Sequence, residues 1–149
     1  MLTLLDSNVL LRAAEPSHAQ HGIAVAALRA LRKAGYDPCV VPQVLYEFWV
    51  VATRPIEQNG LGMSAAEAES EVTRLGPPLF RLFRDERAIY DRWRQLVVPL
   101  NITGKNAHDA RLVAAMQRHG LTHLLTFNVG DFRRYPGIQV VQPQSIIVQ

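Results

Sequence analysis

The stretch L-T-L-L-D-S-N-V, residues 2–9, decides the fold, because it joins an apolar run directly to a group of polar side chains. Its first four residues are typical of a short buried strand, and Asp6 follows at once. Buried carboxylates are usually paired, protonated or bound to a metal, since an unpaired buried charge is strongly unfavourable. Asp6 is therefore a candidate metal ligand. The alternative is that Asp6, Ser7 or Asn8 caps the helix that follows.

Three more carboxylates lie in or beside apolar stretches further along the chain. Glu47 lies within V-L-Y-E-F-W-V-V, Asp109 within A-H-D-A-R-L-V-A-A-M, and Asp131 follows L-L-T-F-N-V-G. None of the four acids has an obvious cationic partner nearby in the sequence. Since hard divalent cations prefer oxygen ligands, the acids together suggest one site that binds such a cation.

Glu47 and Asp109 occupy core-facing positions in predicted helices. Leu112, Val113 and Met116 lie three, four and seven residues after Asp109, and Glu47 has apolar residues at −3, +1 and +4. These spacings put each acid on the apolar stripe of its helix. Two other interpretations stay open. The helix dipole could favour an acid in the first turns of the later helix, and an arginine from another element could pair with Glu47.

Short apolar strands alternate with helical segments, which predicts a single α/β domain over residues 1–149 with a mainly parallel sheet covered on both faces. Strands are expected at residues 2–5, 39–41, 79–83, 123–126 and 138–141. Helices are expected at residues 9–15, 43–53, 86–97 and 105–119. Two further helices have N-cap signals: Ser17 begins a long helix through Lys33, and Ser64 begins another, in which Glu67 completes a capping box.

Sheets of this kind bind ligands beyond the carboxyl ends of their strands. Asp6 directly follows the first strand, and Thr126, Asn128 and Asp131 stand at or just after the end of the strand at residues 123–126. Both groups are therefore expected at the same edge of the sheet. A turn built by Asn128 and Asp131 is the alternative interpretation of the second group.

Composition excludes several classes of protein. With 149 residues, 48% hydrophobic and 19% charged, the chain is not disordered, and it has no run of about 18 apolar residues that could span a membrane. The N-terminus lacks the basic region of a signal peptide. The lone Cys39 is expected to be a buried hydrophobe in a reducing compartment, which favours the cytoplasm. The net charge of +3 suits a polyanionic substrate, although ordinary mildly basic proteins share it.

Other chemistries lack their motifs. The chain contains no G-x-G-x-x-G or G-x-x-x-x-G-K-[ST] phosphate-binding sequence, no H-E-x-x-H zinc motif and no G-x-S-x-G nucleophile turn. The pairs His18/His21 and His119/His123 have the spacing of zinc ligands, but Gly120 breaks the helix of the second pair.

Taken in order, D-S-N-V at residues 6–9, Glu47 in its apolar helix, H-D-A-R-L-V-A-A at 108–115 and L-L-T-F-N-V-G-D-F at 124–132 resemble the PIN-domain family. The resemblance covers nearly the whole chain and is closest to the toxin halves of VapBC-type toxin–antitoxin modules. It implies a three-layer α/β/α fold and a Mg²⁺- or Mn²⁺-dependent ribonuclease with RNA as its substrate. It also implies a homodimer that an antitoxin protein holds inactive.

By this resemblance, Asp6, Glu47 and Asp109 match the first three acids of the family. The fourth acid often stands two residues after the Ser or Thr at the strand end, where this chain has Asn128, so Asp131 is the candidate replacement. We expect Asp6 and Asp109 to ligate the metal, with a contribution from Asp131 or Asn128. We expect Glu47 to orient a water molecule or to act as a base. Asn8 and Thr126 are expected to support the carboxylates, and Lys105 and Arg111 to contact phosphates.

Two other functions remain open at this point. The amide at Asn128 favours a catalytically weakened PIN-like module that binds nucleic acid or acts in regulation. The same type of sheet could also support a metal-dependent phosphatase of small molecules, which substrate size would distinguish from a nuclease.

Overall fold

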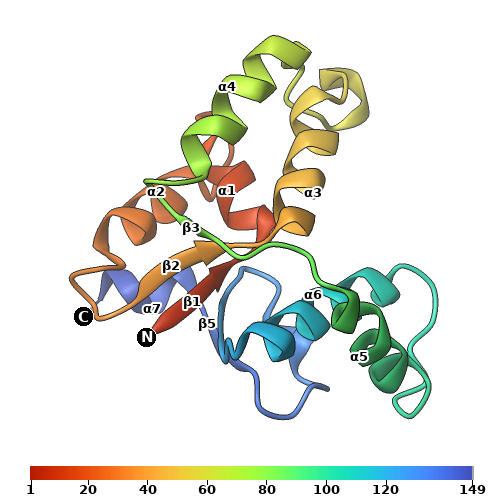
Figure 1. Ribbon diagram of the computed structural model, residues 1–149. Coiled ribbons are helices and arrows are strands. Elements are labelled where there is room, and N and C mark those ends of the chain that lie inside the picture. Colours follow the sequence, from red (N-terminus) through yellow and green to blue (C-terminus); the bar gives the residue numbers. More distant parts are fainter. Residues whose placement is uncertain (149) are drawn as a thin grey trace.

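The central layer of the protein is a parallel β-sheet, drawn as arrows in Figure 1. The computed structural model describes residues 1–148. Within them the strands are ordered β3-β2-β1-β4-β5, and every neighbouring pair is parallel. This confirms the expected α/β class and its parallel sheet. The strands are β1 (Leu2–Leu5), β2 (Asp37–Val40), β3 (Arg81–Leu82), β4 (His123–Leu125) and β5 (Gln139–Val141).

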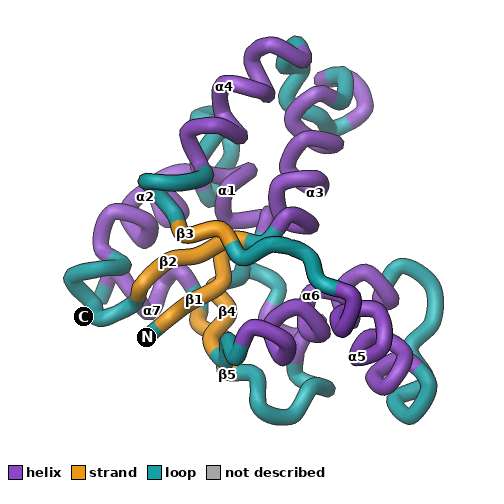
Figure 2. Tube along the Cα trace, in the orientation of Figure 1, coloured by secondary structure: helices purple, strands orange, loops and turns teal. Residues whose placement is uncertain are grey.

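Helices flank the sheet, as the purple and orange tubes of Figure 2 show. Parallel crossovers are right-handed, so the steps from β1 to β2 and β2 to β3 put their helices on one face, and the reverse step from β3 to β4 puts its helices on the other. The helices are α1 (Ser7–Ala13), α2 (His21–Ala30), α3 (Pro42–Thr53), α4 (Ala65–Leu75), α5 (Arg87–Val97), α6 (Asn106–His119) and α7 (Pro143–Ile147), with short 3-10 turns η1 (Ile56–Gln58) and η2 (Val129–Phe132). Helix α7 packs on α2, and α5 packs on α6.

Strand β1 lies in the middle of the sheet and of the hydrophobic core. Leu4 is in register with Cys39 of β2 on one side and with Leu124 of β4 on the other. All three side chains are fully buried, and so is Leu5. A central strand that is apolar on both faces is expected wherever helices cover both sides of a sheet. The carboxyl end of β1 is therefore held in place by the two neighbouring strands, β2 and β4.

Two helix ends follow their sequence signals. The Ser64 hydroxyl accepts the N–H of Glu67, and the Glu67 carboxylate accepts the N–H of Ser64, both at 3.1 Å, which confirms the capping box. Helix α6 ends at Gly120, whose φ of 69° lies in the left-handed region that glycine adopts without steric cost. The predicted end of this helix is confirmed as well.

The helix expected over residues 17–33 is wrong at both ends, because α2 covers only His21–Ala30. A cap at Ser17 would serve the N–H of Gln20, but that group already donates to His18 Nδ1 at 3.0 Å. The N–H of His18 in turn bonds the carbonyl oxygen of Glu15. These local turns use the donors that a helix start at Ser17 would need.

The last strand before α5 and the C-terminal end also differ from expectation. β3 covers two residues instead of the five at 79–83, since it lies at the sheet edge with β2 as its only neighbour. The short helix α7 carries no strong periodic signal and was not expected, whereas η2 lies where a turn at Asn128 and Asp131 was the alternative interpretation.

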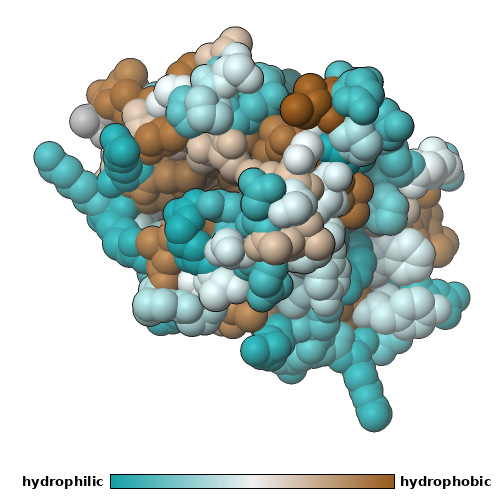
Figure 3. All heavy atoms as spheres, turned by 90° about the horizontal axis from the view of Figure 1, so that it is seen from above, coloured by the Kyte–Doolittle hydropathy of each residue, from teal (hydrophilic) through white to brown (hydrophobic). Residues whose placement is uncertain are grey.

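Some apolar side chains reach the surface. The face in Figure 3 mixes brown apolar patches with teal polar side chains. Tyr46, Val50, Ile56, Tyr90 and Val98 are among the exposed large hydrophobic residues. Over residues 1–148, no helix combines the length and apolar character that crossing a membrane requires.

The substitution Leu4→Ala should lower the free energy of unfolding by about 2–5 kcal/mol, because it leaves a cavity in the central strand that its packed neighbours cannot fill. Urea denaturation followed by circular dichroism measures the change. The matched control is Val98→Ala, at a side chain that is 72% exposed, and it should cost well under about 1 kcal/mol. Equal losses in the two variants would contradict the placement of β1 in the core.

Candidate active site at the carboxyl edge of the sheet

The candidate site lies between the carboxyl ends of β1 and β4. The chain leaves β1 toward one face of the sheet and reaches β4 from the other, so these two neighbours form the topological switch point where α/β sheets bind ligands. Asp6 is the first residue after β1, and Thr126 is the first after β4. The register Leu5↔Leu125 sets them side by side. Both sequence groups thus meet at one edge, as the strand order required.

Asp6 is both an N-cap and a site carboxylate. One oxygen, Oδ1, accepts the N–H of Ser7 at 2.7 Å, which begins α1. The other, Oδ2, accepts the hydroxyl of Thr126 at 2.8 Å and faces Asn8 Nδ2 at 3.4 Å. The side chain is only 7% exposed. The two interpretations of Asp6 from the sequence are therefore compatible, since each uses a different oxygen.

Asn8 and Thr126 lock the ends of β1 and β4 together. Asn8 Nδ2 donates to Thr126 Oγ1 at 3.0 Å, and Asn8 Oδ1 accepts the N–H of Phe127 at 3.3 Å. The N–H of Asn128 donates to the same Thr126 hydroxyl oxygen at 3.0 Å. Because that oxygen accepts two bonds, its own hydrogen is directed at Asp6. Both residues expected to support the carboxylates therefore touch Asp6.

Glu47 approaches the same edge from α3. Its Oε2 accepts the hydroxyl of Ser7 at 3.0 Å, and its Oε1 accepts Gln43 Nε2 at 2.8 Å. The arginine partner that the sequence left open is not found: over residues 1–148 the ion pairs do not include Glu47. A half-buried carboxylate is thus held by two neutral donors.

Asp109 lies in the first turn of α6 and is half-buried. The pKa of its carboxyl is raised to about 6, mainly by burial and also by the negative charges of Asp131 and Glu47, while Arg134 and His108 act to lower it. Of the three acids, Asp109 is therefore close enough to each of the other two to be repelled. Helices α3 and α6 and the turn η2 each bring one of them to the site.

The pKa of Asp6 is raised to about 6 as well. Burial is the main cause, the Thr126 hydrogen bond opposes it, and the charges of Glu47 and Asp109 add to it. Four acids from separate elements thus interact electrostatically: Asp6 with Glu47 and Asp109, and Asp109 in turn with Glu47 and Asp131. Asp6, the buried member of this group, forms no ion pair in the described part of the chain.

Asn128, the residue before η2, and Asp131, within η2, are both exposed. Asp131 raises the pKa of Asp109 by its charge, so it lies near that acid. Asn128 is tied by its backbone N–H to Thr126. The turn interpretation is also correct, because the N–H of Asp131 bonds the carbonyl oxygen of Asn128 at 3.2 Å.

The two expected phosphate contacts differ in setting. Lys105 is exposed just before α6. Arg111 is half-buried: its Nη1 donates to Gln43 Oε1 at 2.8 Å, and its Nη2 lies 3.3 Å from the Asp85 carboxylate. Arg111 therefore links Gln43 of α3 to Asp85 from a half-buried position, and its side chain also lines a surface cavity.

Gln43 is the site residue that the sequence reasoning missed. It is buried, and its Nε2 donates both to Glu47 and to the carbonyl oxygen of His108 at 2.7 Å, while its Oε1 accepts Arg111. This orientation is unambiguous, because the reversed amide would face two acceptors with its oxygen. The available signal was a polar residue one helical turn before Glu47 in an otherwise apolar helix. Gln43 joins α3 to α6 directly beneath the acids.

A shallow cavity of about 550 Å³ opens beside the acids. Glu47 and Asp109 both line it, with Tyr46 and Val50 forming an apolar side. We call it the acid groove; its remaining lining residues are Gln43, His108 and Arg111.

A hard divalent cation fits the chemistry of these side chains. Over residues 1–148, no three His, Cys, Asp or Glu side chains converge closely enough to form a ready-made metal site. Asp6, Glu47 and Asp109 nevertheless present oxygen ligands whose repulsion a cation would relieve. Asp109 and Asp131 have no side-chain hydrogen bonds in this part of the chain and are free to turn toward an ion.

A parallel sheet with a group of unpaired acids at its switch point defines an α/β protein whose pocket suits a divalent cation. Over residues 3–138 the chain matches the PIN domain, and it therefore belongs to the PIN-domain family. Nucleases of this family hydrolyse phosphodiester bonds and generally use divalent metal ions. The family expectation from the sequence is confirmed. Comparison with curated protein sequences gives no significant match.

Solved structures of a toxin and of toxin–antitoxin complexes are similar in fold. VapBC-1 from nontypeable Haemophilus influenzae matches with a TM-score of 0.69 at 12% identity, covering 97% of this chain and 99% of that one. FitAcB from Neisseria gonorrhoeae gives 0.63 at 24% identity, covering 95% and 98%. VapC20 of Mycobacterium tuberculosis, a sarcin-ricin loop cleaving toxin, gives 0.60 at 17% identity, covering 82% and 86%. At these identities the likeness establishes the shared fold.

In metal-free protein, Asp6→Asn should raise the free energy of unfolding at pH 7 by about 1–3 kcal/mol. The folded-state pKa of Asp6, about 6, lies above the ordinary value of 3.8, so the wild-type fold loses stability as pH rises from about 4 to 6, and the loss is complete above that range. The advantage should shrink as pH drops toward 4, where the folded carboxyl is protonated and the unfolded one is close to half protonated. Asparagine can keep the cap by accepting the N–H of Ser7, but its amide nitrogen cannot accept the Thr126 hydroxyl, which offsets part of the gain.

Urea denaturation in EDTA at pH 7, 5.5 and 4 measures this difference. The control Asp91→Asn, at an exposed acid of α5, should change stability little at any of these pH values. A variant that is less stable than wild type at pH 7 would contradict an uncompensated charge at Asp6.

Proposed function

We propose that the chain is a single metal-dependent endoribonuclease domain that acts as the toxin of a toxin–antitoxin module. The observation that carries the proposal is the group formed by Asp6, Glu47 and Asp109 at the switch point of a PIN fold. None of these acids forms an ion pair in the described part of the chain, and Glu47 and Asp109 line a groove on the protein surface.

Asp6, Asp109 and Asp131 are the proposed holders of Mg²⁺ or Mn²⁺, with Asn128 as the alternative to Asp131. When bound, the ion would supply a Lewis acid that neutralises phosphate charge and makes a water more acidic. The support for this assignment is the mutual repulsion of the acids, which a cation relieves.

Glu47 is proposed to orient the attacking water and to accept its proton. Ser7 and Gln43 each donate to one of its oxygens, so the carboxylate is fixed in direction while it lines the acid groove. Asn8 and Thr126 hold Asp6 in the same way, by neutral hydrogen bonds that leave its charge intact.

Lys105 and Arg111 are the cations proposed to contact the RNA backbone. Lys105 is exposed at the start of α6, and Arg111 lines the acid groove. RNA as the substrate is supported by the fold shared with VapC20, a toxin that cleaves the sarcin-ricin loop.

An antitoxin protein and a homodimeric state belong to the same proposal. The structures of similar fold include VapBC-1 and FitAcB, which are toxin–antitoxin complexes. We place the protein in the cytoplasm, in keeping with the buried free thiol of Cys39.

A second candidate is a PIN-like module that binds nucleic acid without efficient cleavage. Two observations favour it: an amide stands at Asn128, and no three acids converge on one point in the described part of the chain. The nuclease is favoured because the charge of Asp131 raises the pKa of Asp109, which supports Asp131 as a fourth carboxylate for the site.

Asp109→Asn should lower the rate of RNA cleavage at least about a hundredfold, since even residues that merely support metal ligands cost 10–100-fold. The measurement is cleavage of labelled single-stranded RNA with and without Mn²⁺. Mn²⁺ should also raise the melting temperature of wild type, and by much less in the variant. Asp91→Asn is the control and should cleave like wild type. A fully active Asp109→Asn would rule out the assignment.

Asp131→Asn should reduce cleavage by orders of magnitude, whereas Asn128→Ala should cost much less, because a carboxylate binds a divalent ion far better than an amide does. Rates of both variants at saturating Mn²⁺ test this order. Near wild-type activity in Asp131→Asn would give the fourth position to Asn128.

A further inference from the structure

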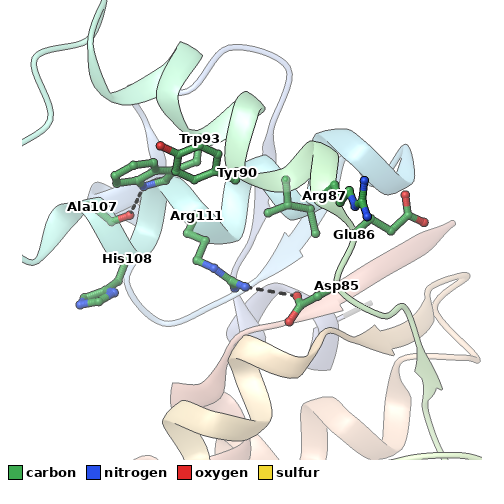
Figure 4. Close-up of a pocket in the computed structure, with 9 residues that line it drawn as sticks. Asp85, Glu86, Arg87, Tyr90, Trp93, Ala107, His108 and Arg111 are labelled. Carbon is green, nitrogen blue, oxygen red and sulfur yellow. Dashed lines mark hydrogen bonds and ion pairs between the residues drawn. The ribbon is translucent and has the colours of Figure 1, made fainter.

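A second cavity, of about 510 Å³, lies between α5 and α6. Tyr90 and Trp93 line one part of it, and Figure 4 shows both rings above the Arg111 side chain that reaches toward Asp85. Ile89 adds an apolar floor. We call this cavity the aromatic pocket. Its volume is within the range of about 300–1,000 Å³ that is typical of small-molecule sites.

The aromatic pair is fixed but open to solvent. The rings of Tyr90 and Trp93 are stacked at 28°, with centroids 6.2 Å apart. Trp93 Nε1 donates to the carbonyl oxygen of Ala107 at 2.8 Å, so the one polar atom of the indole is satisfied. Tyr90 is 61% exposed. Trp93 is thus held in place, and the exposed ring of Tyr90 beside it offers a surface on which a flat ligand can stack.

The aromatic pocket adjoins the acid groove. His108 and Arg111 line both cavities, so the two are neighbours across these side chains of α6. Asp109, which lines the groove, directly follows His108 in the same helix. A chain molecule whose reacting group lies at the acids can therefore place its next unit in the aromatic pocket.

The uncompensated charge of the aromatic pocket is positive. Its two acids are engaged: Asp85 pairs with Arg111, and Glu86 pairs with Arg118. Arg87, at the same end of the pocket in Figure 4, has no ion pair within residues 1–148. A polyanion is therefore favoured over a neutral or cationic ligand.

We propose that the aromatic pocket binds an unstacked nucleobase of the RNA substrate, stacked on Tyr90 and Trp93, with a flanking phosphate at Arg87. The proposal rests on the ribonuclease function above and names a base-binding subsite for it. Exposed aromatic and arginine side chains also occur at protein interfaces. RNA is the favoured occupant because the pocket adjoins the acid groove, with His108 and Arg111 lining both.

A fluorescence titration tests the proposal independently of cleavage. In a Trp49→Phe, Asp109→Asn background, Trp93 is the only tryptophan and the site is inactive. A short single-stranded RNA should quench Trp93 emission, whereas an abasic ribose-phosphate oligomer of equal length should not. Tyr90→Ala should weaken RNA binding at least about fivefold, since one base stack contributes about 1–3 kcal/mol. Tyr90→Phe, which keeps the ring, should bind like the parent.

Kinetics with the acids intact give the second readout. Tyr90→Ala alone should raise KM for RNA and leave kcat nearly unchanged, and Arg87→Gln should weaken binding of RNA and of the abasic oligomer alike. If wild type cleaves RNA while Tyr90→Ala matches it in both constants, the subsite is overturned and the nuclease stands. If wild type does not cleave RNA but quenching still depends on the base, the nuclease fails and the subsite stands.

Light scattering tests whether a second protein chain occupies the pocket instead of RNA. If Tyr90→Ala converts a dimer to a monomer and RNA binding shows no dependence on the base, the pocket is a protein interface, and the proposal is overturned.

Discussion

The hydrogen bond from Thr126 to Asp6 is the contact on which the rest of the site depends. It joins the first residue after β1 to the first residue after β4, across the switch point of the sheet. Asp6 is buried and ionisable, so it needs donors, and Thr126, Ser7 and Asn8 supply them without neutralising it. Its negative charge is thus kept in a buried position, and that charge makes the edge of the sheet a cation-binding environment.

A second link carries this arrangement across to the helices. Gln43 donates to Glu47 on its own helix and to the backbone of α6 beside Asp109. The acids of α3 and α6 therefore cannot move apart without breaking a buried amide's hydrogen bonds, which is costly in an apolar setting. Arg111 completes the link by bonding the same amide and Asp85. The Arg111 side chain also lies between the acid groove and the aromatic pocket, so the same residue helps to position the acids and to shape the neighbouring surface.

Much of the fold could be predicted because the deciding signals are local. The apolar run of β1, the capping box at Ser64 and the glycine that ends α6 each act within a few residues, and all three are observed. The helix start predicted at Ser17 is not observed, because the N–H of Gln20 that Ser17 would have capped donates to His18 instead. Residue type alone does not show which of two neighbouring acceptors such a donor will bond. The edge strand β3 is short because its length depends on one partner across the sheet, not on its own sequence.

The sequence by itself determined which acids would face the core, because helical periodicity and strand ends fix the direction of each side chain relative to its own element. It also determined the family, through the order and spacing of Asp6, Glu47 and Asp109. Only the tertiary structure decided what each acid meets. Ser7 approaches Glu47 and Thr126 approaches Asp6 from other elements, and Gln43 bonds the backbone of α6. The pKa values of Asp6 and Asp109 rise because burial and neighbouring charges are set by packing between distant segments. Contacts between residues far apart in the chain depend on how elements pack in three dimensions, and a one-dimensional pattern does not contain those distances.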